Sequence, residues 1–462
     1  MIIENARILT LDSKNRVLES GNVEVREDGS IGSVAKNGVT RAAGLRTRGE
    51  DPNHTDSRGR LPLRKTNDVR FDAGGRLLMP ALINCHTHLY STLARGISLP
   101  GAAPKNFPEI LKKLWWRLDR ALNEQDVYYS ALVGVMDSAR CGVGTLVDHH
   151  SSPSAVNGSL DVIERAFREV GLRGVLCYET TDRNGPANAE EGLNENVRFG
   201  ERARKSDGLV SASFGLHASF TLSDRTLLRC VEANESLGTG FHVHVSEDRS
   251  DNDDARKKHG QSPVRRLHEM GILDERSLAA HCIHVSDGDI ALLARHKINA
   301  VHNPQSNCNN AVGSAKVLEM VKAGVLVGLG SDGYTPRMWE EFKTAFHVQK
   351  LRAGDPRVAY GEAYTLALLN NRQIAKKIWN LDVGSIEEGA RADMVLYDYY
   401  PPTPLTGDNI FGHALFGIAN APVNSLIVDG HFVIRDHQFV NIDERAVAEK
   451  AATCARELWR RF

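Results

Sequence analysis

The stretch Leu77–His88, which reads LLMPALINCHTH, is the first of four short segments that decide the fold. It is apolar and ends in two histidines spaced two residues apart, as expected at the carboxyl end of a buried strand. Three later segments also end apolar, β-branched runs: HVSE at 244–247, AAHC at 279–282 and GLGSDG at 328–333. In a barrel of alternating strands and helices, the strand ends meet at one mouth, where active sites lie. The four segments therefore predict a barrel with a polar site at that mouth.

Eight strand candidates follow one another through the middle of the chain, mostly separated by stretches with apolar residues at helical spacing. Eight strand–helix alternations predict an α/β protein with a (β/α)8 TIM-like barrel. The strand candidates cover residues 77–88, 142–150, 172–180, 209–219, 240–247, 277–285, 298–307 and 324–333.

Both ends of the chain show strand-like alternation outside the barrel segments, and 462 residues exceed the usual size of a single core. We therefore expect a small composite β-sandwich domain built from residues 1–75 and 385–442. The barrel is predicted over 76–384, and a closing helix over 443–462. Residues 37–67 are polar and rich in Gly, Arg, Asp and Asn, which favours a long surface loop.

The composition excludes several kinds of partner. Charged residues make up 25% of the chain and the formal net charge is -1, so electrostatics favours neither nucleic acid nor an anionic membrane. No apolar run approaches the roughly 20 residues that a membrane helix needs. The start, MIIENARILTLDSKNR, has charges where a secretory signal needs an apolar core. The seven cysteines are scattered without a CxxC pair, so we expect a reduced, cytoplasmic interior.

Histidines and one aspartate at the strand ends form a ligand set for a divalent metal. His86 and His88 are two apart on a strand, so both side chains point to the same face, the barrel interior. His242 and His244 have the same spacing, which does not choose between them. Asp332 ends the eighth strand and supplies a carboxylate. Three imidazoles and one carboxylate predict a hydrolytic metal site, with zinc expected and iron as the alternative.

Together these segments resemble the amidohydrolase superfamily, in its group of cytosine deaminases, guanine deaminases and chlorohydrolases. The resemblance covers nearly the whole chain and includes EEGARADMVLYD at 387–398. MPALINCHTH departs from the family's MPGLID or MPGFID at Ala81 and Asn84, without loss of a ligand. Within the group, the chain is similar to the SsnA-type aminohydrolases through LKKLWWRLDRAL (111–122), VDHHSSP (147–153), ETTDRN (179–184) and PTPLTGDNIFGHALFG (402–417).

The resemblance implies roles for the site residues. The family's HxxE pattern selects His244 as a metal ligand and Glu247 as the acid that moves protons to a ring nitrogen and to the leaving amine. His281 matches the histidine that orients the attacking hydroxide, and Asp332 accepts the proton of the water. Two-metal relatives bridge their ions with a lysine on the fourth strand, where this chain has no lysine and His217 near the strand end. The resemblance thus implies one metal per chain.

Substrate contacts are expected from residues that follow the barrel strands. Tandem tryptophans on a helix after the first strand are placed where a lid could cover a planar ring, with core packing as the alternative. Residues after the third, fourth and seventh strands are placed to contact a ring edge, with exposed or packing roles as alternatives. The candidates are Tyr90, Trp115, Arg183, His217 and Gln305.

The implied reaction is hydrolytic deamination of a purine- or pyrimidine-like heterocycle with release of ammonia. One alternative is hydrolysis at a triazine-type carbon with loss of chloride or an alkylamine. An alternative of another class is a non-catalytic relative that keeps the barrel for binding or assembly. The expected partners are a small heterocyclic substrate and water, with no nucleic acid and no membrane, and we expect a homodimer or larger homo-oligomer.

Overall fold

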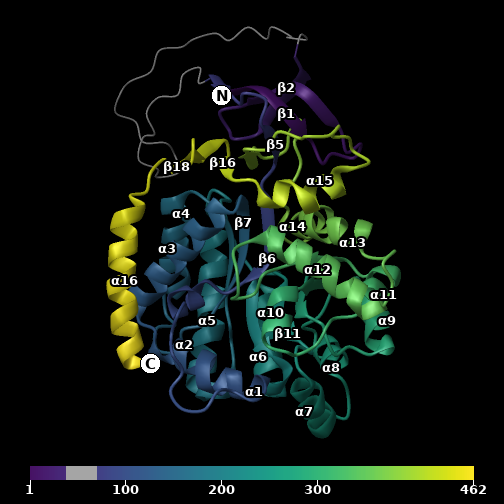
Figure 1. The fold of residues 1–462 in the computed structure, drawn as a ribbon. Helices are drawn as coiled ribbons and strands as arrows, with labels where there is room; N and C mark the ends of the chain where they lie inside the picture. The colour runs from purple at the N-terminus through teal and green to yellow at the C-terminus, as the bar shows by residue number, and fades with distance from the viewer. Residues whose placement is uncertain (38–69) are drawn as a thin grey trace.

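The barrel strands form two parallel sheets that share one interrupted strand. Helices lie around these strands (Figure 1). The computed structural model describes residues 1–37 and 70–462. The first sheet contains β6 (Leu82–Thr87), β7 (Val143–His150), β8 (Arg173–Tyr178) and β9 (Val210–Ala212). The second contains β10 (Phe214–Ala218), β11 (Phe241–Val245), β12 (Leu278–His281), β13 (Asn299–His302) and β14 (Val327–Leu329). β9 and β10 are separated only by Ser213, so the fourth barrel strand belongs to both sheets.

Backbone contacts also join the two sheets at their other edges. Thr87 of β6 forms an isolated parallel bridge with Asp332, which follows β14. The N–H groups of Ser331 and Asp332 both donate to the carbonyl of His86, at 2.9 Å. The eight strands are thereby arranged as a ring, which confirms the predicted barrel class.

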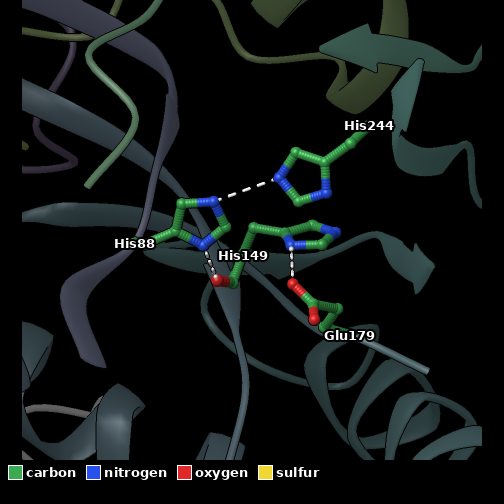
Figure 2. A group of neighbouring side chains, drawn as sticks. All are labelled: His88, His149, Glu179 and His244. Atoms are coloured by element: carbon green, nitrogen blue, oxygen red, sulfur yellow. Dashed lines mark hydrogen bonds and ion pairs between the residues drawn. The ribbon is translucent and has the colours of Figure 1, made fainter. Parts of the chain in front are cut away.

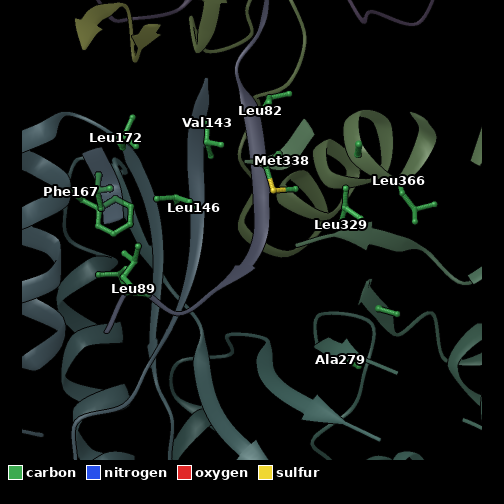
Figure 3. Packing of buried hydrophobic residues seen from close by; sticks show 14 of the residues in the cluster. Leu82, Leu89, Val143, Leu146, Phe167, Leu172, Ala279, Leu329, Met338 and Leu366 are labelled. Carbon is green, nitrogen blue, oxygen red and sulfur yellow. The ribbon is translucent and has the colours of Figure 1, made fainter. Parts of the chain in front are cut away.

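Helices between the strands cover the outside of the barrel and bury apolar residues at helical spacing. Phe167 on α4, for example, packs within the core shown in Figure 3 and is fully buried. A Cβ at Gly174 on β8 would lie 2.8 Å from the Phe167 ring, so only glycine permits this close approach. The principal helices are α3 (Glu124–Arg140), α4 (Ser159–Val170), α5 (Pro186–Ala203), α6 (Asp224–Glu235), α7 (Arg249–His259), α8 (Pro263–Glu269), α9 (Asp287–Arg295), α12 (Met338–Ala353) and α14 (Asn371–Trp379).

Strands from both chain ends form one nine-stranded sheet beside the barrel, which agrees with the predicted composite of the two ends. The described strands form one continuous sheet, and its packing as a β-sandwich stays a prediction. Its order is β18-β17-β16-β15-β5-β1-β2-β3, with β4 also paired to β1. The members are β1 (Ile2–Leu9), β2 (Val17–Val25), β3 (Ile31–Lys36), β4 (Arg70–Asp72), β5 (Leu77–Pro80), β15 (Met394–Tyr397), β16 (Val423–Val428), β17 (His431–Arg435) and β18 (Gln438–Phe439).

The stretch 77–88 is two strands, and its prediction as a single strand was wrong. Leu77–Pro80 pairs with β1 and β15 in the composite sheet, and the barrel strand β6 begins at Leu82. Between them the Ala81 N–H donates to the carbonyl of Asp393, which directs the chain from one sheet to the other. The domain boundaries given above stay a prediction, and the loop predicted over 37–67 lies, from residue 38 on, outside the described residues.

A buried ionic network connects the barrel to the composite sheet. The Arg173 guanidinium at the start of β8 donates to both carboxylate oxygens of Asp393, at 2.8 and 3.1 Å, and to Asp429 at 3.3 Å. The three side chains are 2 to 6% exposed. The N–H of Asp429 also donates to Asp393 at 2.7 Å.

We expect Arg173→Ala to lower the free energy of unfolding by about 3–5 kcal/mol, because Asp393 would keep a buried charge without its guanidinium. Denaturant unfolding of the intact protein measures this loss. Arg445→Ala is the control, since Arg445 is 91% exposed in its pair with Glu449 and should cost less than about 1 kcal/mol. Equal stability of both variants would contradict a structural role for the network.

The last helix, α16 (Glu444–Arg461), lies along the barrel beside α3 (Figure 1). Its Cys454 thiol donates to the buried carboxylate of Asp126 at 3.0 Å. Its Trp459 indole donates to the carbonyl of Leu93 at 2.7 Å, in the segment that follows the first histidines. Among the residues that the structure describes, no helix combines the length and the apolar character needed to cross a membrane.

Candidate active site and metal centre

The histidines and the aspartate predicted as metal ligands converge at the barrel mouth. His86 lies on β6 and His88 directly follows that strand, His244 lies on β11, and Asp332 comes three residues after the end of β14. His88 Nε2 lies 3.1 Å from His244 Nε2 and 3.1 Å from Asp332 Oδ1. His86 Nε2 lies 3.7 Å from the same carboxylate oxygen. The structure thus brings all four side chains to one point.

Backbone carbonyls orient two of these rings. His88 Nδ1 donates to the carbonyl of His149 at 2.6 Å, and His244 Nδ1 donates to the carbonyl of His217 at 2.8 Å. Because a carbonyl only accepts, each ring carries its hydrogen on Nδ1 when neutral and presents the lone pair of Nε2 to the mouth. This is the usual way in which an outer hydrogen bond prepares a histidine for a metal.

His86 is oriented by His242, the neighbour that the spacing alone left as an alternative ligand. His86 Nδ1 lies 2.8 Å from His242 Nε2. His242 Nδ1 lies 3.8 Å from the Cys177 sulfur, whose thiol donates to the carbonyl of Asp148. With the thiol hydrogen engaged, His242 donates to the sulfur and accepts from His86. His242 therefore lies behind His86, and His86 presents Nε2 to the mouth.

The donor set fits a divalent cation. The nitrogens of His86, His244 and His281 lie within 4.8 Å of one another, as do the ligand atoms of His86, His88 and Asp332. Nε2 of His86 and of His281 is buried without a hydrogen-bond partner among the described residues. Imidazole nitrogens and a carboxylate that face one another in this way suit zinc.

The electrostatics of His86 and His244 agree with this fit. Burial lowers the pKa of His86 and His244 well below the ordinary value, so both rings are neutral, the form that binds metal. Burial also acts to lower the pKa of His88, but the Asp332 carboxylate raises it to about 9. Burial acts to raise the pKa of Asp332, yet the hydrogen bond and charge of His88 hold it far below its usual range.

Glu247 and His281 lie beside this cluster. His281 Nε2 is 3.6 Å from Glu247 Oε2 and 3.9 Å from Asp332 Oδ2. His281 Nδ1 lies 2.9 Å from the Asn307 amide oxygen and donates to it, which leaves Nε2 as an acceptor. Burial, and then the Asp332 carboxylate, raise the pKa of Glu247 well above its usual value, which favours its protonated form. A protonated carboxyl is the form that a general acid needs.

The backbone at these strand ends is strained. His281 has φ +72° and Asp332 has φ +56°, and Ser246, just before Glu247, has φ +50°. Non-glycine residues rarely adopt this left-handed conformation, which persists where the surrounding structure holds it. The strain turns the side chains from the strand direction into the mouth.

A pocket opens from the cluster and holds about 840 Å³ of space, part of it open to solvent. Three of the predicted substrate contacts, Tyr90, Trp115 and His217, line the pocket together with Trp116. Trp115 and Trp116 lie at the junction of two short helical segments, η2 (Leu111–Trp115) and α2 (Trp116–Ala121), that cover the mouth.

The other two predicted contacts do not line the pocket. Arg183 forms an ion pair with Asp119 and lies over the Trp116 ring, 5.5 Å from its centre. The amide of Gln305 donates to Thr344 Oγ1 at 3.3 Å, away from the mouth. Contact of Arg183 or Gln305 with substrate stays a prediction.

Sequence reasoning missed Glu179, which directly follows β8 and lines the pocket. Figure 2 shows it beside His149, with His88 and His244 on the other side of that ring. Glu179 Oε2 lies 3.3 Å from His149 Nδ1. The signal was available, because Glu179 is a polar residue at the end of a barrel strand. Ser306 was also missed, and its hydroxyl donates to Asp332 Oδ2.

A barrel with histidines and carboxylates at its strand ends is typical of metal-dependent hydrolases. The chain belongs to the amidohydrolase family, whose model matches residues 77–433.

Two relatives named as deaminases match most of the chain. A 5-methylthioadenosine/S-adenosylhomocysteine deaminase of Desulforudis audaxviator is 34% identical over 410 residues, which cover 87% of this chain and 91% of the relative. A 5'-deoxyadenosine deaminase of Methanosarcina mazei is 30% identical over 465 residues, which cover 99% and 98% of the two chains. Among solved structures, an adenosine deaminase of Xanthomonas campestris with bound zinc has a TM-score of 0.82 at 21% identity, over 99% of this chain and 98% of that one. At that identity the last likeness concerns the fold alone.

Proposed function

We propose that this protein is a metal-dependent hydrolase of non-peptide carbon–nitrogen bonds that deaminates a purine-like heterocycle and releases ammonia. The observation that carries the proposal is the convergence of the three metal-facing imidazoles with Asp332, Glu247 and His281 at the mouth of one pocket. Membership of the amidohydrolase family and two relatives named as deaminases of adenosine-type compounds support it.

One divalent ion, with zinc as the expected metal, would be held by His86, His88, His244 and Asp332. Such an ion supplies a nucleophile at neutral pH, because it lowers the pKa of a water molecule from about 15.7 toward about 7. Zinc in the related barrel of the adenosine deaminase supports this choice.

The protein's own residues move the protons. Asp332 Oδ2 accepts the proton of the attacking water. Glu247 starts protonated and donates to the ring nitrogen, which makes the adjacent carbon electrophilic. The Glu247 carboxylate then carries the hydroxyl proton of the tetrahedral intermediate to the leaving amine, and the proton held by Asp332 returns to Glu247. His281 Nε2, fixed as an acceptor by Asn307, lies between the two carboxylates and orients the water. An amidine-like carbon that bears an amine suits this arrangement.

Dechlorination or loss of an alkylamine from a triazine-type ring would use the same residues, but the named relatives favour deamination. A non-catalytic relative would have no need of both proton-carrying carboxylates. We also propose a cytoplasmic location, which the free state of all seven cysteines supports. A homo-oligomeric state stays a prediction.

A panel of ring compounds tests the proposed function. We expect ammonia release from at least one adenosine-type compound, such as 5'-deoxyadenosine or 5'-methylthioadenosine, with kcat/KM of at least about 10⁴ M⁻¹s⁻¹. Guanine, cytosine, a pterin and chlorinated s-triazines complete the panel, scored for ammonia and chloride. Activity confined to ring opening of hydantoins or dihydropyrimidines, with no release of ammonia, would contradict the proposal.

A further inference from the structure

Glu179, His149 and His217 form one side of the site, which we call the acceptor wall, and the proposed reaction does not use them. Glu179 and His217 line the pocket, and His149 lies behind them. Glu179 Oε2 is 3.3 Å from His149 Nδ1, and its Oε1 is 3.8 Å from His217 Nε2. Among the described residues, none donates a hydrogen bond to the Glu179 carboxylate.

His149 presents a lone pair to Glu179. Its Nε2 lies 3.2 Å from the carbonyls of both Leu216 and His242, so Nε2 carries the hydrogen. In the neutral ring Nδ1 is therefore an acceptor, and it is buried without a hydrogen-bond partner. An acceptor that faces a carboxylate at 3.3 Å needs a donor or a cation nearby.

His217, like His149, presents a lone pair to Glu179. Its Nδ1 lies 2.6 Å from Thr221 Oγ1, and the Thr221 hydroxyl gives its only hydrogen to the carbonyl of Ala218. His217 Nδ1 must therefore donate to Thr221, and Nε2 is left as an acceptor. Both histidines thus turn lone pairs toward one carboxylate.

The ionic groups around the acceptor wall carry a net negative charge. Arg183 approaches Glu179 to 3.7 Å, but it is also paired with Asp119, so these three groups carry a formal charge of -1. Asp119 Oδ1 is buried without a hydrogen-bond partner. Within the described part of the chain, no lysine or arginine lines the pocket, whereas these carboxylates do: Asp119, Glu179, Glu247, Asp248, Asp251 and Asp332.

We propose that the acceptor wall is a substrate subsite in which Glu179 and His217 bind a neutral or cationic group rich in N–H donors. This inference rests on the proposed function, because it places the subsite beside the reacting carbon, next to His244. The substrate is then an amidine- or guanidine-like heterocycle with a donor edge directed away from Glu247, and a carboxylate or phosphate there is excluded.

Three planar probes of one shape test the subsite by calorimetric titration of the metal-loaded protein: benzamidine, benzamide and benzoate. We expect benzamidine to bind most tightly and benzoate most weakly. Glu179→Gln should raise the Kd of benzamidine at least about tenfold, because a charge-assisted pair is lost, and should change that of benzamide less than about threefold. Glu190→Gln is the matched control, since Glu190 pairs with Arg229 outside the pocket and should leave all three affinities unchanged.

Several results would overturn the subsite. One is an unchanged benzamidine affinity in Glu179→Gln with full metal content. Another is preference for benzoate that disappears in Arg183→Gln, which would make this an anion subsite. A third is loss of a second equivalent of metal from Glu179→Gln, which would show an inorganic cation there. Should Glu179→Gln fail to fold, Glu179→Asp and the wild-type order of the probes decide. Binding is measured without turnover, so failure of deamination leaves this test intact.

Discussion

Replacing His86 with alanine is expected to remove most of the bound metal and to lower kcat/KM at least about 10³-fold. The physical reason is that His88, His244 and Asp332 alone would leave a zinc ion with three protein ligands in a site built for four. Elemental analysis of the purified wild type should give about one metal per chain, and of His86→Ala much less. Circular dichroism of the variant should show the wild-type content of helix and strand.

His284→Ala is the control for this experiment. His284 comes three residues after His281, the last residue of β12. Its Nε2 donates to the carbonyl of Val312 and does not face the metal-facing cluster. Metal content should therefore stay near one per chain in this variant. A full complement of metal in His86→Ala would show that the ligand set is misassigned. Two tightly held ions per wild-type chain would contradict the assignment of a one-metal site.

Glu247→Gln is expected to keep the metal and to lose at least about 10²-fold in kcat, the usual scale of general acid–base catalysis. Glutamine preserves the size of the side chain but has no proton to exchange. The carboxyl of Glu247 lies 3.6 Å from His281, and burial and the Asp332 carboxylate raise its pKa, which favours the protonated acid in the wild-type enzyme. Steady-state kinetics on the best substrate of the ring panel, with metal analysis of the same sample, measure both effects.

The two readouts separate the roles of Glu247. Loss of metal together with rate would make Glu247 a ligand, and an unchanged kcat would remove it from catalysis. Glu190→Gln, the half-exposed control on α5, should match the wild type in both measurements.

The barrel and the convergence of its metal-facing residues were predictable because they depend on local patterns. A two-residue spacing puts His86 and His88 on one face of a strand whatever the rest of the chain does. Parallel strands that close into a barrel then bring residues as distant as His88 and Asp332 to 3.1 Å. The roles of these residues remain for the variants above to test.

Features that depend on long-range contacts were not predictable. His242 and His244 have different surroundings, because only His242 is hydrogen-bonded to His86, 156 residues earlier in the chain. Arg183 follows a barrel strand, as several pocket residues do. Its ion pair with Asp119 nevertheless holds it outside the pocket lining. The division of 77–88 into two strands depends on pairing with strands from both chain ends, which the stretch itself does not show.

The position of α16 bears on how the protein is best tagged for purification. Arg117, one residue after the paired tryptophans that line the pocket, lies over the Phe462 ring, 4.6 Å from its centre. A polyhistidine fusion after Phe462 would therefore begin beside the pocket's covering segment and place extra imidazoles near a metal-binding mouth. The amino group of Met1 instead donates to Val25 in the composite sheet, at the other end of the molecule (Figure 1). A fusion at Met1 keeps the added imidazoles away from the metal-binding mouth. They then do not disturb measurements of metal stoichiometry or kinetics.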